Sequence, residues 1–260
     1  MKKKLSPSPP RGRGSGRGLT RFFVTGTDTG VGKTEVAAAL LSLMSRPFAY
    51  KPCESGDNAD SEALRVAAGS WQAPESVCLY RFKAPLAPAL AARKERRRVD
   101  WKRLLAGFRA RGEGPGVVEG AGGLFVPLDE RHDVIDLIEA TRLPVVLVAR
   151  AGLGTINHTV LSLQALALRK IPVAAVVLVQ AVDREEPSRS TNRAELARRF
   201  QRLTFFGPVG FEADGSLRRK RLRKVLAPLL LGQKGALPLS PTLSPVGERE
   251  TVHGQPTRAK

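Results

Sequence analysis

Hydrophobic positions along the chain alternate between short apolar runs and longer segments with helical spacing. The apolar runs predict strands at residues 22–25, 48–51, 116–119, 144–149, 172–179 and 207–211. The helical spacing predicts helices at residues 34–45, 60–68, 85–98, 100–111, 133–141, 155–169 and 192–201. In the segment 100–111, Trp101, Leu104, Leu105 and Phe108 fall on one helix face, which is therefore expected to be buried.

The predicted strands are continuous runs of Val, Ile and Leu without polar alternation, as in strands that helices cover on both faces. Repeated strand–helix units predict an α/β fold with a doubly wound, mostly parallel sheet, whose ligand binds at the carboxyl ends of the strands. Residues 21–232 are expected to form this one domain. The flanking segments 1–20 and 233–260 are rich in Pro, Gly, Ser and Arg and are predicted to be disordered tails.

The formal net charge is +19, of which residues 1–20 carry +6 and residues 233–260 carry +2, so the predicted domain is itself basic at +11. Such a charge attracts nucleotides, nucleic acids or acidic membrane surfaces. The first tail is either a nucleic-acid-binding arm or a solvated extension, and its composition favours the extension.

Cys53 and Cys78 are the only cysteines, and they lack the spacing of a zinc site or a disulfide framework. No apolar stretch follows the lysines at the start, so no secretory signal is predicted. The longest apolar runs, 143–149 and 171–179, are too short to span a membrane. We therefore expect a soluble, cytoplasmic protein without a membrane partner.

The segment FFVTGTDTGVGKT, residues 22–34, places a Gly-rich turn between a strand and a helix. This arrangement is typical of a phosphate loop, whose backbone N–H groups and helix dipole bind phosphate oxygens. Lys33 is expected near the β- and γ-phosphates, and the Thr34 hydroxyl on Mg²⁺. The usual spacing requires glycine at position 27, but the chain has Thr27 there and glycine one residue earlier, at Gly26.

Two acids and a second lysine are candidates for the chemistry of phosphoryl transfer. Glu119 ends a buried strand and precedes glycines, as a metal-binding acid at a sheet edge does, although a surface carboxylate is the alternative. Asp60 opens a helix, so it is either a metal ligand or an N-cap. Lys51 ends a strand and either stabilises developing negative charge or is an ordinary solvated lysine.

Five segments resemble the dethiobiotin synthetase family, in that family's order. They are FFVTGTDTGVGKT, KPCESG, YRFKAPLAPALAA, VEGAGGLFVPL and LPVVLVARAGLGTINHTVLSLQAL, and the resemblance covers about residues 21–212. It implies a P-loop enzyme of biotin biosynthesis in which CO₂ and 7,8-diaminononanoate form a carbamate. ATP then phosphorylates this carbamate, and the second amine closes the ureido ring of dethiobiotin. The altered glycine spacing of the first segment is also a feature of the family.

The resemblance also implies roles for individual residues. An ATP site is implied at Gly30, Val31, Gly32, Lys33, Thr34, Glu35, Asp60, Glu119, Gly120, Ala121, Gly122, Gly210, Phe211 and Glu212. A substrate site is implied at Thr29, Ser55, Thr155, Ile156 and Asn157. Lys33 and Lys51 would be catalytic, and Thr34, Asp60 and Glu119 would hold Mg²⁺, with ATP as co-substrate. The segment 155–157 would bind the substrate's tail carboxylate at a dimer interface, which implies a homodimer.

Three features depart from the family pattern. The segment between Lys33 and Lys51 is short, and Val179-Gln180 stands where the family has an asparagine that recognises adenine. The runs 93–98 and 218–224 have no family role, and solvated helix faces are the expected account of their arginines and lysines.

Two alternative functions remain at this point. One is a related P-loop enzyme that ligates or amidates another small molecule. The other is a nucleotide-switched, DNA-binding ATPase of the partitioning type. Such ATPases usually carry a second lysine early in the phosphate loop, whereas the loop here reads TGTDTGV. No nucleic acid partner is therefore expected.

Overall fold

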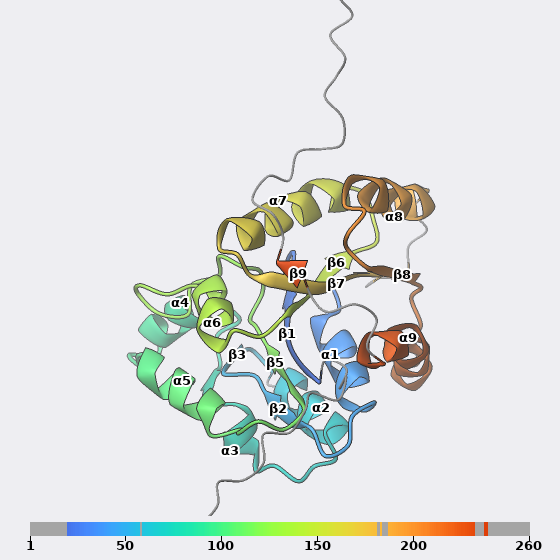
Figure 1. The fold of residues 1–260 in the computed structure, drawn as a ribbon. Helices are drawn as coiled ribbons and strands as arrows, with labels where there is room; N and C mark the ends of the chain where they lie inside the picture. The colour runs from blue at the N-terminus through green and yellow to red at the C-terminus, as the bar shows by residue number, and fades with distance from the viewer. Residues whose placement is uncertain (1–19, 58, 181–182, 184–186, 232–236, 239–260) are drawn as a thin grey trace, which may run out of the picture.

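The computed structural model describes residues 20–57, 59–180, 183, 187–231 and 237–238, and a parallel sheet lies at its centre (Figure 1). The strand order is β2-β5-β1-β6-β7-β8. The strands are β1 (Arg21–Gly26), β2 (Phe48–Tyr50), β5 (Gly116–Glu119), β6 (Val145–Arg150), β7 (Pro172–Val179) and β8 (Phe205–Val209). The doubly wound α/β fold expected from the sequence is confirmed.

Nine helices in the described part of the chain surround this sheet. They are α1 (Lys33–Leu41), α2 (Ala59–Ala67), α3 (Pro74–Val77), α4 (Pro88–Lys94), α5 (Trp101–Arg109), α6 (Val134–Thr141), α7 (Thr155–Leu168), α8 (Ser188–Arg199) and α9 (Gly215–Leu230). Figure 1 shows α7 and α8 on one side of strands β6 to β8, and α1 and α9 on the other. None of these helices is both long and apolar enough to cross a membrane.

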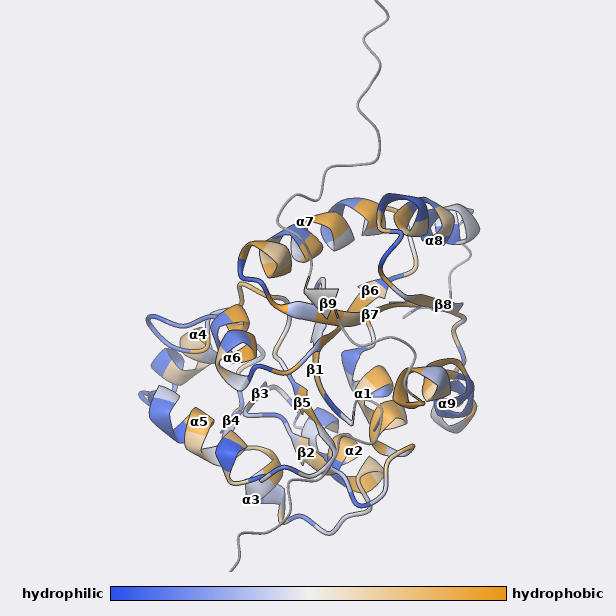
Figure 2. Cartoon of the chain, in the orientation of Figure 1, coloured by the Kyte–Doolittle hydropathy of each residue, from blue (hydrophilic) through white to orange (hydrophobic). Residues whose placement is uncertain are grey.

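The sheet separates two hydrophobic clusters because neighbouring side chains of a strand point to opposite faces. Phe22 belongs to the cluster that packs against α1 and α9, and Phe23 to the cluster that packs against α5, α6 and α7. Figure 2 shows hydrophobic residues along the central strands and hydrophilic residues over much of α8. In α5, Leu104 is buried, and Trp101, Leu105 and Phe108 pack against the cluster that contains Phe23, as the sequence predicts.

Several boundaries differ from the predicted ones for local reasons. Helix α4 begins only at Pro88, because the residue before a proline avoids the helical region and Ala87 is extended, with ψ 142°. It ends at Lys94, and Arg96 then adopts a left-handed φ of 52°. Helix α1 ends at Leu41, where the hydroxyl of Ser42 donates to the carbonyl of Ala39. The last predicted strand lies two residues earlier, at 205–209.

Five elements were not predicted from the sequence, among them the short helix α3. Strands β3 (Cys53–Ser55) and β4 (Tyr80–Phe82) form a separate two-stranded parallel sheet and are too short to show a pattern. Helix α9 is rich in Arg and Lys, yet Leu222, Leu226 and Leu229 mark its buried face. Strand β9 (Leu237–Pro238) pairs with β7 within the segment 233–260, where the sequence predicts disorder. The rest of that segment, and residues 1–19, lie outside the described residues.

The side chain of Gln72 completes the hydrogen bonding of β2, which lies at the edge of the central sheet. The N–H of Ala49 donates to Oε1 of Gln72 at 2.6 Å, and Nε2 of Gln72 donates to the carbonyl of Ala49 at 3.1 Å. Both residues are buried. Gln72 therefore supplies the hydrogen bonds that a further strand would give to Ala49, which lies two positions before Lys51.

We expect Gln72→Ala to lower the free energy of unfolding by about 2–4 kcal/mol, because it leaves two buried backbone groups unpaired. Urea unfolding followed by circular dichroism measures this change. Gln201→Ala, at an exposed position after α8, is the control and should change the value by less than about 0.5 kcal/mol. Equal stability of the two variants would contradict the role assigned to Gln72.

Candidate active site

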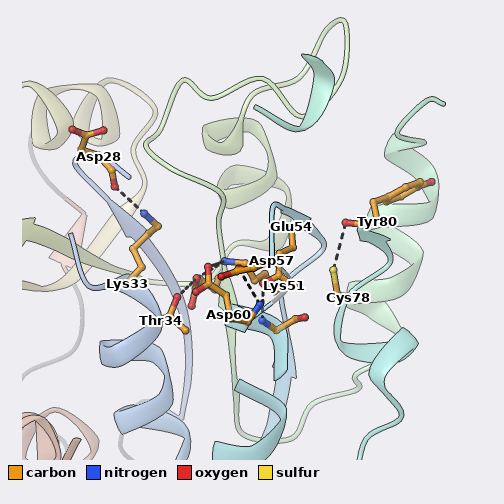
Figure 3. Close-up of polar contacts among 12 residues, drawn as sticks. Asp28, Lys33, Thr34, Lys51, Glu54, Asp57, Asp60, Cys78 and Tyr80 are labelled. Carbon is orange, nitrogen blue, oxygen red and sulfur yellow. Dashed lines mark hydrogen bonds and ion pairs between the residues drawn. The ribbon is translucent and has the colours of Figure 1, made fainter. Parts of the chain in front are cut away.

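Three adjacent strands of the sheet bring the candidate residues to one edge. Lys51 follows β2, Glu119 is the last residue of β5, and the phosphate loop follows β1. These strands are neighbours and run parallel, so their carboxyl ends meet. Figure 3 shows Lys33, Thr34, Lys51 and Asp60 gathered at this edge. The position agrees with the rule that doubly wound sheets bind ligands at the carboxyl ends of their strands.

The structure of the phosphate loop explains why the glycine stands at position 26 and not at position 27. A Cβ atom on Gly26 would lie 2.8 Å from a methyl group of Val31 and 2.9 Å from the carbonyl oxygen of Asp28, so the position requires glycine. Gly32 caps α1 with a φ of 94°, a conformation that favours glycine. Helix α1 begins at Lys33, so the free N–H groups of its first turn and its dipole provide an anion site.

A buried ionic cluster lies beside this loop. Nζ of Lys51 is 2.5 Å from Oε1 of Glu119 and 2.9 Å from Oδ2 of Asp60. The hydroxyl of Thr34 donates to the same Glu119 oxygen at 2.9 Å. Lys51 is 3% exposed and Glu119 is fully buried. Nearby, Nζ of Lys33 donates to the carbonyl oxygen of Asp28 at 2.8 Å. The short segment before Lys51 therefore does not displace it from the site.

The charges of this cluster shift the pKa values of its members. Burial acts to lower the pKa of Lys51, but the carboxylates of Glu119 and Asp60 outweigh burial and raise it, so Lys51 stays positively charged. Burial also raises the pKa of Glu119. Burial lowers the pKa of Lys33, with the charge of Lys51 adding to this effect. Burial opposes ionisation of Asp60, yet the Lys51 ammonium holds the pKa of Asp60 below its ordinary value.

A cavity of about 590 Å³ opens next to the cluster. The sequence-predicted residues that line it are Thr29, Gly30, Gly32, Lys33, Thr34, Glu35, Lys51, Ser55, Asp60, Ala121 and Gly122. The lining residues that the sequence did not single out are Cys53, Glu54, Pro85, Leu86, Ala87, Pro88, Val126 and Arg218. The arrangement suits a polyphosphate and a second, smaller ligand side by side.

Other predicted site residues lie outside this cavity. Val31 is buried in the core, and a Cβ atom on Gly120 would contact Val134 and Phe23. Both positions therefore pack against the core. Thr155 lines a separate small cavity of about 90 Å³ together with Thr29, Gly30, Arg150 and His158. Ile156 packs against the core, and Asn157 is exposed at the start of α7.

The segment Gly210–Glu212 contacts α9 and the end of β7. The N–H of Phe211 donates to Oε1 of Gln180 at 3.1 Å, and the guanidinium of Arg218 lies 5.0 Å from the centre of the Phe211 ring. Glu212 forms an ion pair with Arg221. None of the three predicted residues lines the cavity that contains Lys33 and Lys51.

The expectation that all of residues 218–224 form a solvated helix face is wrong for Arg218. This residue lines the large cavity, and its guanidinium donates to the carbonyl oxygen of Gln180 at 2.8 Å. Helix α9 packs against α1, which carries the phosphate loop at its start, and this contact brings the first turns of α9 to the site. The sequence contains no local signal for such a contact.

Comparison with known proteins gives matches over most of the chain. Residues 20–216 match the family model described as an AAA domain. The ATP-dependent dethiobiotin synthetase BioD of Anaeromyxobacter dehalogenans (strain 2CP-C) is 46% identical over 224 residues, which cover 81% of this chain and 97% of that protein. The enzyme of the same name from Agrobacterium fabrum (strain C58 / ATCC 33970) is 45% identical over 167 residues, 64% of this chain and 77% of that protein. A solved ParA family ATPase from Chlorobium tepidum TLS overlaps with a TM-score of 0.47 at 13% identity and covers 85% of this chain and 94% of that chain.

Proposed function

The chain belongs to the ATP-dependent dethiobiotin synthetase family, and from that premise we propose that its buried lysine–carboxylate cluster serves phosphoryl transfer from ATP during closure of the ureido ring. The protein is an ATP-dependent ligase of biotin biosynthesis. The observation that carries the proposed mechanism is the convergence of Lys33, Lys51 and Glu119 beside one cavity.

The proposed reaction forms three bonds in turn. One amine of 7,8-diaminononanoate combines with CO₂ to form a carbamate, and a carbamate oxygen attacks the γ-phosphorus of ATP as ADP departs. The second amine then attacks the carbonyl carbon of the carbamoyl phosphate, and phosphate leaves as the ring closes. The carbamate is already an anion, so the phosphoryl transfer needs no general base.

The phosphoryl transfer brings two anions, the carbamate and the triphosphate, together. The residues of the cavity are suited to this step. Lys33 and Lys51 border the same space, and each can reduce the repulsion between carbamate and triphosphate. Two unit charges about 4 Å apart interact by roughly 4 kcal/mol at an effective dielectric constant near 20. The raised pKa of Lys51 keeps this residue cationic at neutral pH, which supports its role.

The oxygen atoms at the site fit Mg²⁺. Oε2 of Glu119 is buried without a hydrogen-bond partner, and Thr34 and Asp60 lie beside it. The described residues contain no group of three His, Cys, Asp or Glu able to hold a metal unaided. Magnesium commonly uses one or two carboxylates and completes its shell with phosphates and water. We propose that Thr34, Asp60 and Glu119 hold Mg²⁺, which would neutralise charge on the transferred phosphoryl group.

The remaining site assignments are proposals that rest on the family resemblance. Thr29, Ser55 and the backbone of residues 120–122 would contact the reacting end of the diamine, and Gly210–Glu212 would flank the nucleobase. Residues 155–157 would bind the tail carboxylate. Residues 155–157 lie outside the large cavity, which supports the proposal that a second copy of the chain contributes to the binding of the carboxylate.

We propose a homodimer in which α7 lies at the interface. Leu161 and Leu168 of α7 are 56% and 74% exposed, a large apolar exposure for a single helix. Burial against a second copy would remove this surface from water. Size-exclusion chromatography with light scattering tests the proposal, and a monomer at micromolar concentration would contradict it.

Turnover of the purified protein tests the function as a whole. We expect 7,8-diaminononanoate, bicarbonate and MgATP to give dethiobiotin and ADP in equal amounts, measured by mass spectrometry and a coupled ADP assay. ADP release that depends on a different amine or carboxylate would favour another P-loop ligase. ATP-dependent and salt-sensitive binding of DNA, without ligase turnover, would favour the partitioning-type ATPase.

We expect deletion of residues 1–18 to leave kcat and both KM values within about twofold of the full chain, since the assigned site residues lie between Thr29 and Glu212 and changes away from a site usually have small effects. Steady-state kinetics of the truncated and full-length proteins provide the comparison. A large loss of rate on deletion would show that the basic segment takes part in activity.

A further inference from the structure

Glu54 is a buried carboxylate of the cavity that the mechanism above does not use. It lies on β3, is 4% exposed and lines the same cavity as Lys33 and Lys51. Its Oε1 accepts a hydrogen bond from the N–H of Ser61 in α2 at 3.0 Å. Its Oε2 is buried and has no hydrogen-bond partner. Figure 3 labels Glu54, Lys51 and Asp60, and all three line the same cavity.

No cation of the described chain compensates this carboxylate. Lys51 directs its ammonium at Glu119 and Asp60, and no Lys, Arg or His in the described ranges forms an ion pair with Glu54. A charge held away from water is costly unless it is paired, so a partner from outside the chain would relieve this cost. Because Glu54 borders the cavity, a bound ligand with a positive charge could supply that partner.

The cavity thus has two chemically different parts. The phosphate loop, Lys33 and Lys51 favour anions, and Glu54 favours a cation. The carbamate of the diamine has the same polarity, since one nitrogen carries the anionic carbamate while the other is an alkyl amine. Alkyl amines of this kind have pKa values near that of lysine, about 10.4, so the free amine is an ammonium at neutral pH.

We propose that Glu54 binds the free ammonium group of the diamine and thereby orients the nitrogen that closes the ring. The ammonium gives up one proton, to water or to the departing phosphate, and its nitrogen attacks the carbonyl carbon as the neutral amine. This inference rests on the proposed function and adds a substrate-binding residue to it. With the carbamate held toward the two lysines and the ammonium held by Glu54, the substrate can bind in only one direction. A monoamine of the same length lacks the second contact.

A purely structural role for Glu54 is the alternative, because its Oε1 caps a free N–H group at the start of α2. The variant Glu54→Gln separates the two roles. Its amide oxygen still accepts the hydrogen bond from Ser61, but the negative charge is lost. A capping role therefore predicts little change, whereas an ammonium-binding role predicts weaker binding of the diamine alone.

Steady-state kinetics of Glu54→Gln provide the test. We expect the KM for 7,8-diaminononanoate to rise at least tenfold, while the KM for ATP and the melting temperature stay close to those of the wild type. Glu62→Gln, on the exposed surface of α2 and paired with Arg65, is the matched control and should leave both KM values unchanged. A diamine KM within twofold of the wild type, in a folded Glu54→Gln protein, would overturn the inference.

Two further measurements keep the test decisive. Should Glu54→Gln not fold, a monoamine of the same length is tested as a competitive inhibitor of the wild-type protein, and an inhibition constant equal to the diamine KM would overturn the inference. The wild-type protein is assayed alongside. If it forms no dethiobiotin, the proposed function fails. If it is active and Glu54→Gln matches it, only the role of Glu54 fails.

Discussion

Replacing Lys51 by Gln is expected to reduce kcat by roughly 100- to 1,000-fold while ATP still binds, because a cation that faces developing charge acts mainly in the transition state. Lys51 is buried between Glu119 and Asp60, where water screens its charge only weakly. The phosphate loop does not depend on it, since Lys33 and the first turn of α1 belong to a different element. Turnover assays and calorimetric titration with ATP measure the two effects separately.

The same substitution leaves Glu119 buried without its ion-pair partner, and breaking such a pair costs about 3–5 kcal/mol of stability. Activity is therefore compared well below the melting temperature, and retained ATP binding shows that the site is folded. Lys102→Gln, at an exposed position of α5, controls for a general loss of positive charge and should behave as the wild type. Activity of Lys51→Gln within about tenfold of the wild type would rule out the catalytic role.

Replacing Glu119 by Gln is expected to lower kcat by about 100-fold and to raise the Mg²⁺ concentration for half-maximal activity by about tenfold or more. The amide oxygen still accepts the hydrogen bond of Thr34, so the start of α1 keeps its contact. What is lost is the negative charge that both Lys51 and a divalent cation require. Initial rates at varied Mg²⁺ and fixed ATP measure the change.

The matched control is Glu113→Gln, which removes a fully exposed carboxylate in the loop before β5. Its pairing with Arg21 is a surface ion pair, so we expect no change in the Mg²⁺ requirement and a stability change of at most about 1 kcal/mol. If Glu119→Gln keeps the wild-type Mg²⁺ dependence, the proposed metal site at Thr34, Asp60 and Glu119 is wrong.

Local sequence was sufficient to predict most of the sheet and the phosphate loop. The predicted strands at 116–119 and 172–179 match β5 and β7 in full, because strands that are covered on both faces have mostly apolar residues. Gly26 and Gly32 were predictable as parts of one loop, since the tight contacts at Gly26 involve nearby residues of the loop and Gly32 adopts a backbone conformation that favours glycine. Short or charged elements such as β3, β4 and α9 could not be predicted, because residues distant in the sequence bury them.

The sequence by itself determined which residues have the right chemistry: a loop that binds phosphate, two lysines, and acids that follow buried strands. Only the tertiary structure decided which of them meet. Glu119 and Lys51 are 68 positions apart and touch because β2 and β5 lie side by side, and Arg218 reaches the cavity because α9 packs on α1. The tertiary structure also identified Glu54 as a candidate residue, because only the surroundings of a carboxylate in space show that one of its oxygens lacks a hydrogen-bond partner.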